Sequence, residues 1–275
     1  MSARLSSTAP QVHARIRGAL HDIEMRRQQK APPNQLDVKT NTSQGPAPAD
    51  NDPNKDLVNR LITDNKALWD QLLTNTFPAL KMGTLKQGDP GYDEAVKGFK
   101  WYMIQDFMYC TRDVGYQSDR AVQTDDVFEY VSIIQKAQKY CDYAIDSLAT
   151  CVNKPDADVP GLGIDPKIVF KSKPTSTLND YTDFQHSKAE HENWSYYQIA
   201  DALSKDPKVD KTAPWYKTFI TANLSPKSVN DQIKFFQDYY EGWKDHYEEA
   251  SDIFRQACIG EINLWGVTAN PPKDI

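Results

Sequence analysis

The sequence predicts an all-α protein, a single-domain multi-helical bundle of roughly seven or eight helices. Long segments carry apolar residues at the three-and-four spacing that gives a helix one apolar face. No segment alternates apolar and polar residues as a half-buried strand does, and no hairpin signal occurs. With 275 residues, among them 14 Tyr, 10 Phe and 6 Trp, the chain is long enough to bury a sizeable core.

The helices expected in the first half follow one another from residue 56 onward. Residues 56–77 put five leucines on one side, and Pro78 and Gly83 interrupt the segment that follows. Residues 92–116 form a second helix, and residues 125–152 a long third one. Each of these segments has an inward stripe of large apolar residues, so we expect them to pack against one another.

The second half begins with a loop rich in Pro and Gly at residues 155–167. Residues 173–203 are expected to be largely helical, and the helix that ends near Leu203 has a clear apolar face. Another helix is expected from about Ala213, because Pro214 suits a first helical turn. Residues 225–269 carry one long helix or two.

Residues 1–55 differ in composition from the rest of the chain. The stretch up to residue 21 has Arg and no acid and faintly resembles an organelle transit peptide, and the stretch after it is rich in Pro, Asn and Ala. We expect a disordered N-terminal extension at 1–55 and one helical domain at 56–275. A cytoplasmic location is expected, with organelle import through the extension as the alternative.

Charge and hydropathy narrow the classes of partner. The net charge of -6 is spread along the chain without a Lys/Arg cluster, so no nucleic-acid partner is expected. No apolar run approaches the roughly 20 residues that span a bilayer, so no membrane partner is expected. The four cysteines form no CxxC pair, which is typical of buried thiols in a reducing compartment.

Three acids interrupt apolar helix faces. Glu192 extends the stripe that runs through residues 196–203, Asp106 lies in the stripe of 92–116, and Glu261 lies in the last one. Burying a carboxylate costs several kcal/mol unless partners or chemistry compensate, so three such acids indicate a shared polar pocket. The alternative is that each acid pairs with a buried Lys, Arg or Trp N–H, or faces solvent in a first helical turn.

Five stretches of the sequence follow one another in the order of a known family's motifs. They are FPALKMGTL (77–85), WYMIQDFMY (101–109), DYT (180–182), NWSYYQIADAL (193–203) and EINLWGVTA (261–269). Through them the chain resembles the TenA/THI-4 family, the thiaminase II and aminopyrimidine hydrolase group, which has the heme-oxygenase-like helical fold. The Gln-Asp pair and the terminal Glu are the most specific features of the resemblance, which runs from about residue 60 to 270.

The resemblance implies four substrate-binding residues. Asp106 matches the aspartate that holds the aminopyrimidine ring, and Tyr109 matches a tyrosine of the same pocket. Tyr181 resembles the tyrosine that lines the pyrimidine site, and Tyr196 matches the tyrosine that follows the tryptophan of its helix. A further family tyrosine, expected in the helix after Ala213, has no counterpart at the matching position, and Leu264 replaces an aromatic residue of the family pattern.

The resemblance also implies two catalytic acids. Glu261 matches the acid that gives and takes protons, and Glu192 occupies the position of the family's catalytic cysteine. A carboxylate in an apolar pocket activates water rather than attacking carbon, so the two acids could divide the base and acid roles. This acid-bearing branch implies hydrolysis of aminomethyl or formylaminomethyl pyrimidine to hydroxymethyl pyrimidine in thiamin salvage, without cofactor or metal, by a homo-oligomer.

Two other functions remain open from the sequence. A non-heme iron oxidase on the same scaffold needs Glu and His at helical spacing, and the chain offers Asp183 with His186, Glu190 with His191, and His246 with Glu249. A pocket repurposed for another small molecule in specialised metabolism is the second, because one fold can carry unrelated sites.

Overall fold

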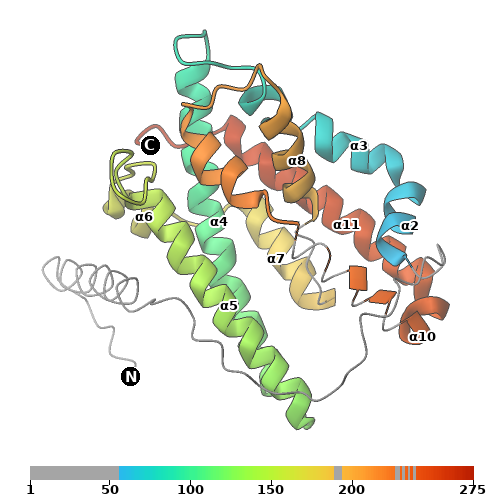
Figure 1. Ribbon diagram of the computed structural model, residues 1–275. Coiled ribbons are helices and arrows are strands. Elements are labelled where there is room, and N and C mark those ends of the chain that lie inside the picture. Colours follow the sequence, from blue (N-terminus) through green and yellow to red (C-terminus); the bar gives the residue numbers. More distant parts are fainter. Residues whose placement is uncertain (1–55, 189–193, 227–229, 231–232, 235, 238–239) are drawn as a thin grey trace, which may run out of the picture. The chain divides into compact units, whose positions relative to one another are not determined.

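The computed structural model describes residues 56–275 except 189–193, 227–229, 231–232, 235 and 238–239. Within this part every regular element is helical, and no strand occurs (Figure 1). The predicted all-α class is confirmed. The N-terminal extension proposed at 1–55, and with it the organelle signal, lies outside the described residues, as does the proposed catalytic Glu192.

The first predicted helix is two helices. Helix α2 spans Leu57–Asp64 and α3 spans Lys66–Thr74, with Asn65 between them. Asn65 leaves the helical conformation, with φ -113° and ψ 28°. Its buried side-chain amide donates to the carbonyl of Leu61 and to Ser251 Oγ of a distant helix. The break arises because asparagine can replace backbone hydrogen bonds with its own side chain.

Two long helices lie side by side as the longest pair in the fold (Figure 1). Helix α4 spans Tyr92–Ala121 and α5 spans Val127–Val152, close to the predicted ranges. Gly91, with φ 84°, precedes α4, and Asp93 and Glu94 in the first turn complement its dipole. The face of α4 that carries Asp106 is therefore held between α5 and the C-terminal helices.

Short helices fill the middle of the chain. Helix α6, Pro166–Lys171, starts inside the loop predicted at 155–167 and continues through residues for which no helix is predicted. Its N-cap Asp165 accepts a hydrogen bond from the backbone N–H of Lys167, and Pro166 occupies the first turn, so the start signals were present in the sequence. Helix α7, Ser176–Lys188, and helix α8, Trp194–Lys205, lie in the segment predicted to be helical.

Two segments form π-helical turns instead of the expected patterns. Pro78, expected as a breaker, opens the π-helical turn Pro78–Met82. The helix expected near Ala213 is a π-helical turn, Tyr216–Ile220, followed by the 3-10 turn Thr221–Asn223. Such wide turns are frequent near functional sites because they redirect side chains within a helical run.

The C-terminal region carries the last long helix. Its described parts are α10 (Tyr240–Trp243), a 3-10 turn (Lys244–His246), α11 (Tyr247–Gly266) and a final 3-10 turn (Val267–Ala269). The single-helix alternative for this region is wrong, because the 3-10 turn separates α10 from α11. Helix α11 packs on both α7 and α3 and so runs through the middle of the helical array (Figure 1).

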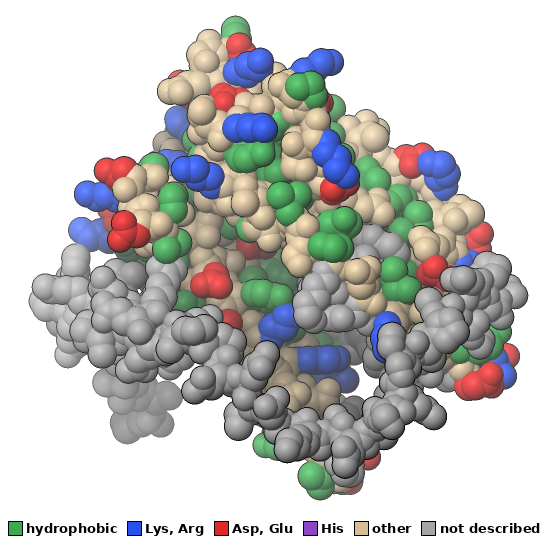
Figure 2. Space-filling model, in the orientation of Figure 1, with side chains coloured by type: hydrophobic (Ala, Val, Ile, Leu, Met, Phe, Trp, Pro, Cys, Tyr) green, Lys and Arg blue, Asp and Glu red, His purple; other side chains and the backbone are tan. Residues whose placement is uncertain are grey.

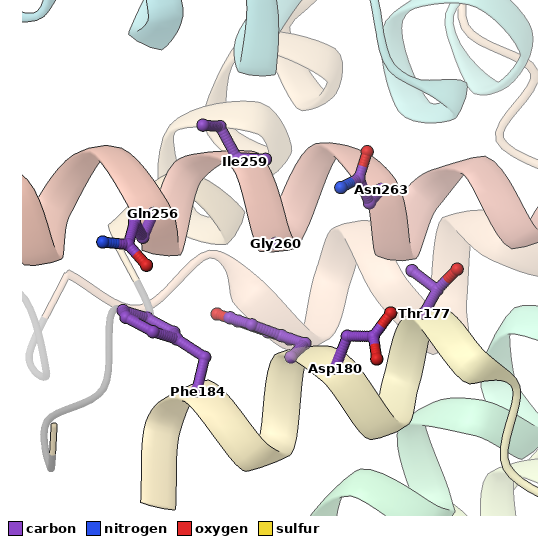
Figure 3. A pocket seen from close by; sticks show the side chains of 8 residues that line it. Thr177, Asp180, Phe184, Gln256, Ile259, Gly260 and Asn263 are labelled. Atoms are coloured by element: carbon purple, nitrogen blue, oxygen red, sulfur yellow. The ribbon is translucent and has the colours of Figure 1, made fainter. Parts of the chain in front are cut away.

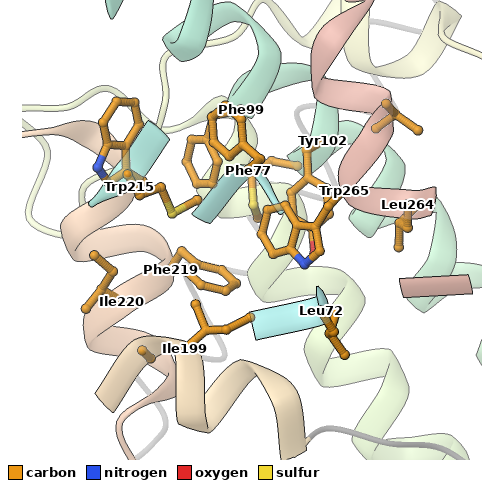
Figure 4. Packing of buried hydrophobic residues seen from close by; sticks show 14 of the residues in the cluster. Leu72, Phe77, Phe99, Tyr102, Ile199, Trp215, Phe219, Ile220, Leu264 and Trp265 are labelled. Carbon is orange, nitrogen blue, oxygen red and sulfur yellow. The ribbon is translucent and has the colours of Figure 1, made fainter. Parts of the chain in front are cut away.

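Aromatic rings form the centre of the core (Figure 4). Trp265 stacks on Tyr102 with ring centroids 3.9 Å apart and planes 9° apart, and Phe219 meets Trp265 edge-on at 5.2 Å. Trp215 and Phe99 are fully buried beside them, 6.1 Å apart and nearly perpendicular. Interlocked rings tolerate little movement, so this cluster holds the nearby polar side chains in defined positions.

A glycine lets α4 approach the end of the chain. A Cβ atom at Gly98 would lie 2.3 Å from the carbonyl oxygen of Thr268. We expect Gly98→Ala to lower the free energy of unfolding by about 1–3 kcal/mol, because backbone atoms cannot move aside. Denaturant titration measures this, with Gly115→Ala of the same helix as the control, where a Cβ meets nothing within 4 Å. A Gly98→Ala protein as stable as the control would contradict the expectation.

The charge of the surface and the hydropathy of the helices complete the description of the fold. Acidic and basic side chains of the described residues are intermixed on the face that Figure 2 shows. None of the helices in the described part of the chain is both long enough and apolar enough to cross a membrane.

Candidate active site

Glu261 of α11 is a buried carboxylate held by tyrosines. Its residue exposure is 5%. Tyr181 of α7 donates to Oε1 at 2.8 Å, and Tyr196 of α8 donates to Oε2 at 2.8 Å. Three helices thus converge on one side chain, and both oxygens accept a hydroxyl proton. Donation to both oxygens compensates for the burial of this carboxyl group.

Tyr102 of α4 extends this hydrogen-bonded group. Its hydroxyl oxygen lies 2.9 Å from that of Tyr196, and its ring lies flat on Trp265. The sequence places Tyr102 on the inward face of its helix and at the first tyrosine of the family pattern at 101–109, and it predicts no role for this residue. A usable signal was present, because Tyr102 precedes Asp106 by one helical turn and so shares its face.

Asp106 lies on the same face of α4. Its Oδ2 accepts a hydrogen bond from Ser147 Oγ of α5 at 3.2 Å. Burial raises the pKa of Asp106 to about 6, against the smaller opposite effect of the Ser147 hydrogen bond. The carboxyl group therefore changes charge close to neutral pH, which is typical of a functional position.

Tyr109 completes the set of predicted tyrosines. Its hydroxyl accepts a hydrogen bond from Gln185 Nε2 of α7 at 3.0 Å. Its ring is nearly parallel to that of Tyr181, with planes 14° apart and centroids 6.1 Å apart. Tyr109 is thereby linked through Tyr181 to Glu261, so the structure brings Tyr109, Tyr181 and Tyr196 together around one acid.

Electrostatic effects show that these groups share one region. Burial raises the pKa of Tyr102 well above its usual value, and the charges of Asp106 and Glu261 raise it further. The pKa of Tyr196 is raised by burial first and then by Glu261. For Tyr109, burial again has the largest effect, and Glu261 adds to it. The hydroxyls therefore stay protonated at neutral pH and remain available as donors.

Two of the three acids that interrupt apolar faces lie in this group. Asp106 and Glu261 both act on Tyr102, which lies within electrostatic reach of each. The hydrogen bonds described for Glu261 come from tyrosine hydroxyls, whereas the buried Nε1 of Trp265 has no partner among the described residues. The Nε1–H of Trp265 is therefore not the donor that holds Glu261. The position of Glu192 lies outside the described residues.

Phe219 occupies the place where the segment after Ala213 meets the site. Its ring lies 5.7 Å from that of Tyr196 and 5.2 Å from that of Trp265. The positions at which the resemblance suggested a tyrosine, Ala222 and Asn223, lie in the following 3-10 turn, where Ala222 is exposed. This segment therefore contributes a ring without a hydroxyl.

A pocket of about 220 Å³ lies between α7 and α11 (Figure 3). Tyr181 is one of its lining residues, and Gly260 is another. A Cβ atom at Gly260 would lie 2.3 Å from Cδ2 of Tyr181. The missing side chain at Gly260 is what allows the tyrosine to approach α11 closely enough to reach Glu261.

Of the residues considered for iron, those whose side chains the structure describes, Asp183, His246 and Glu249, are exposed. His246 Nδ1 lies 3.9 Å from the carboxylate of Glu249, and both side chains are exposed. Asp183 is exposed, and the pair at 190–191 lies outside the described residues. In the described part of the chain no three His, Cys, Asp or Glu side chains come together as metal ligands.

Comparisons with known proteins identify the fold. The sequence matches no protein-family model and no curated protein. Among solved structures, the chain is similar to a TenA homologue protein from P. horikoshii OT3, with a TM-score of 0.56 and 18% sequence identity. The match covers 78% of this chain and 98% of that chain. The chain therefore has the TenA-like, heme-oxygenase-like helical fold that the sequence motifs predict.

Proposed function

We propose that this protein hydrolyses aminomethyl or formylaminomethyl pyrimidine to hydroxymethyl pyrimidine, as in thiamin salvage. The observation that carries the proposal is the buried Glu261, which accepts hydrogen bonds from Tyr181 and Tyr196 and acts together with Asp106 on Tyr102. The TenA-like fold and the motifs around these residues support the same substrate class. In the described part of the chain, the site is made of acids and hydroxyls.

The reaction replaces an exocyclic C–N bond by a C–O bond. Water supplies the oxygen, and one proton moves from the water to the leaving nitrogen. That nitrogen leaves as ammonia from the aminomethyl substrate and as formamide from the formylaminomethyl substrate. Glu261, which accepts hydrogen bonds from two hydroxyl groups, is proposed to take that proton and return it. Glu192 is proposed as the second acid, and Asp106 as the carboxylate that holds the amidine-like edge of the ring.

The proposed chemistry uses no thiol. Burial, followed by the charge of Asp106, raises the pKa of the thiols of Cys110 and Cys151, so they stay protonated. Cys258 is also buried. A protonated thiol is a poor nucleophile, which favours activation of water by a carboxylate over attack by cysteine.

The test is release of hydroxymethyl pyrimidine. The protein is incubated with aminomethyl pyrimidine, formylaminomethyl pyrimidine and thiamin, and the product is separated by chromatography. Product formation from the first two, lost in Glu192→Gln, supports the proposal. Absence of turnover with all three substrates overturns it.

Substrate binding is expected to weaken in acid. Because the pKa of Asp106 is raised to about 6, its carboxylate dominates above that pH and is mostly protonated one unit below it. Affinity for hydroxymethyl pyrimidine, measured by calorimetry, should fall about 10- to 100-fold below pH 6 through loss of a charge-assisted hydrogen bond. Asp106→Asn should bind weakly at every pH, whereas Asp119→Asn, at an exposed position of the same helix, should behave like the wild type. A wild-type affinity independent of pH contradicts this role.

A second candidate function is a pocket of this fold repurposed for another small molecule. Phe219 favours it, because the segment after Ala213 presents a ring without a hydroxyl to Tyr196. A more apolar ring or substituent would suit this position better than a polar one. Tight binding of hydroxymethyl pyrimidine analogues without turnover would support this candidate over the hydrolase.

A further inference from the structure

We propose that Tyr102 is a positioning residue that orients the hydroxyl of Tyr196 toward Glu261 and forms the outer end of a proton relay to that acid. Tyr102 aligns with the first tyrosine of the family pattern at residues 101–109, and the resemblance implies no role for it. The part of the proposal that concerns turnover rests on the proposed hydrolase function. The part that concerns the protonation of Glu261 is independent of it.

The direction of the hydrogen bonds follows from counting protons. Tyr196 has one hydroxyl proton, and it is donated to Oε2 of Glu261 at 2.8 Å. The contact of 2.9 Å between the hydroxyls of Tyr102 and Tyr196 must therefore use the proton of Tyr102. The hydrogen bonds thus run from Tyr102 to Tyr196 and from Tyr196 to Glu261. Each hydroxyl becomes a stronger donor because it accepts the hydrogen bond before it.

Packing holds Tyr102 in this role. The side chain is 1% exposed, and its ring lies between Trp265, at 3.9 Å, and Phe99, at 6.5 Å. Both neighbouring rings are within 17° of parallel to it. The ring cannot swing away without opening the core, so the hydroxyl stays aimed at Tyr196.

Several titratable groups face the hydrogen bonds that join Tyr102, Tyr196 and Glu261. Asp106 and Cys110 act on Tyr102 from its own helix, and Tyr196 and Glu261 act on it from α8 and α11. On the far side of Glu261, Tyr181 donates from α7, and Tyr109 of α4 is within electrostatic reach. Among the described residues, Asp106 and Glu261 are the two acids that act on Tyr102. The row of hydrogen bonds from Tyr102 to Glu261 therefore connects the surroundings of these two acids.

The relay moves one proton and changes no other bond. A proton accepted by the Tyr102 oxygen releases the hydroxyl proton of Tyr102 to Tyr196, and Tyr196 passes its own proton to Oε2 of Glu261. Glu261 becomes a carboxylic acid, and both tyrosines are restored with their hydroxyls turned round. The proton taken from the attacking water, or returned to the leaving amine, can follow this route in either direction.

The test compares titrations of the Glu261 carboxyl group. Its infrared band is identified by its disappearance in Glu261→Gln, in protein without substrate. Tyr102→Phe should raise the midpoint by about 0.7 pH units, which corresponds to about 1 kcal/mol at 1.36 kcal/mol per unit. Tyr92→Phe is the matched control, since Tyr92 lies on the same helix against Trp215, and Asp106 and Glu261 are not among the charges that act on it.

A double-mutant cycle separates relay from general packing. If Tyr102 acts through Tyr196, the Tyr102→Phe/Tyr196→Phe protein should titrate like Tyr196→Phe alone. Additive shifts, or an unchanged midpoint in Tyr102→Phe, overturn the proposal. The Tyr196→Phe and Tyr196→Phe/Tyr102→Phe comparison also decides the matter should Tyr102→Phe alone prove unstable.

The turnover arm uses the pH dependence of kcat/KM. Tyr102→Phe should lower kcat about tenfold and shift the acidic limb of the kcat/KM profile to higher pH by the same 0.7 pH units. Tyr92→Phe should change neither kcat nor the profile. A tenfold fall in kcat with an unmoved limb argues for a merely structural role and overturns the relay. If the wild type hydrolyses no pyrimidine, the proposed function fails, and the infrared titration still decides the role of Tyr102.

Discussion

Glu261→Gln is expected to lower kcat for release of hydroxymethyl pyrimidine roughly 10²- to 10⁴-fold, the range that a positioned acid or base contributes. Glutamine has the same shape as glutamate and cannot exchange protons with water or with a leaving amine. Its amide oxygen can still accept from Tyr181 or Tyr196, so only one of the two hydroxyl donors at 2.8 Å loses its acceptor. We therefore expect a folded protein that binds pyrimidine but does not turn it over.

Steady-state kinetics with the aminomethyl and formylaminomethyl substrates measure this loss. Glu248→Gln is the matched control, because Glu248 is an exposed acid in the first turn of the same helix. Thermal unfolding should give similar midpoints for both variants. Retention of more than a tenth of wild-type kcat in Glu261→Gln would exclude Glu261 as the acid and base of the reaction.

Gly260→Ala is expected to damage both stability and activity. The new Cβ would lie 2.3 Å from Cδ2 and 2.5 Å from Cε2 of Tyr181, so the ring or the whole of α7 must move. Overpacking of this kind costs about 1–3 kcal/mol of unfolding free energy. The displaced hydroxyl would also lose its contact with Glu261, and a hydrogen bond to a charged group is worth roughly 1.5–3 kcal/mol, or about 10- to 100-fold in rate.

The control for this variant is Gly266→Ala on the same helix. A Cβ at Gly266 meets nothing within 4 Å, and its backbone is helical, so alanine there should be neutral or stabilising by up to about 1 kcal/mol. Urea titration and kcat are measured for both variants. Equal stability and equal activity of the two alanine proteins would show that the Tyr181 contact is dispensable.

The helices and the two acids could be predicted because the signals are local. Helical periodicity alone indicated α4, α5 and α8, and it marked Asp106 and Glu261 as acids within apolar stripes. A side chain placed one turn from buried residues on a helix is itself directed inward, whatever the rest of the chain does. The breaks between helices were harder to predict from the sequence. Asn65 ends α2 partly through a hydrogen bond to Ser251, which lies on a distant helix.

Tertiary packing decided which groups meet. Tyr181 and Tyr196 are 80 and 65 positions away from Glu261 in the chain, and Tyr102 is 94 positions from Tyr196. The helical periodicity of the sequence does not tell which side chains meet when they are that far apart in the chain. They are set by the fit between helices, for example the space that Gly260 leaves for the Tyr181 ring. The chain's own pattern therefore determined that acids would be buried in a helical protein, and packing between helices determined which hydroxyls hold them.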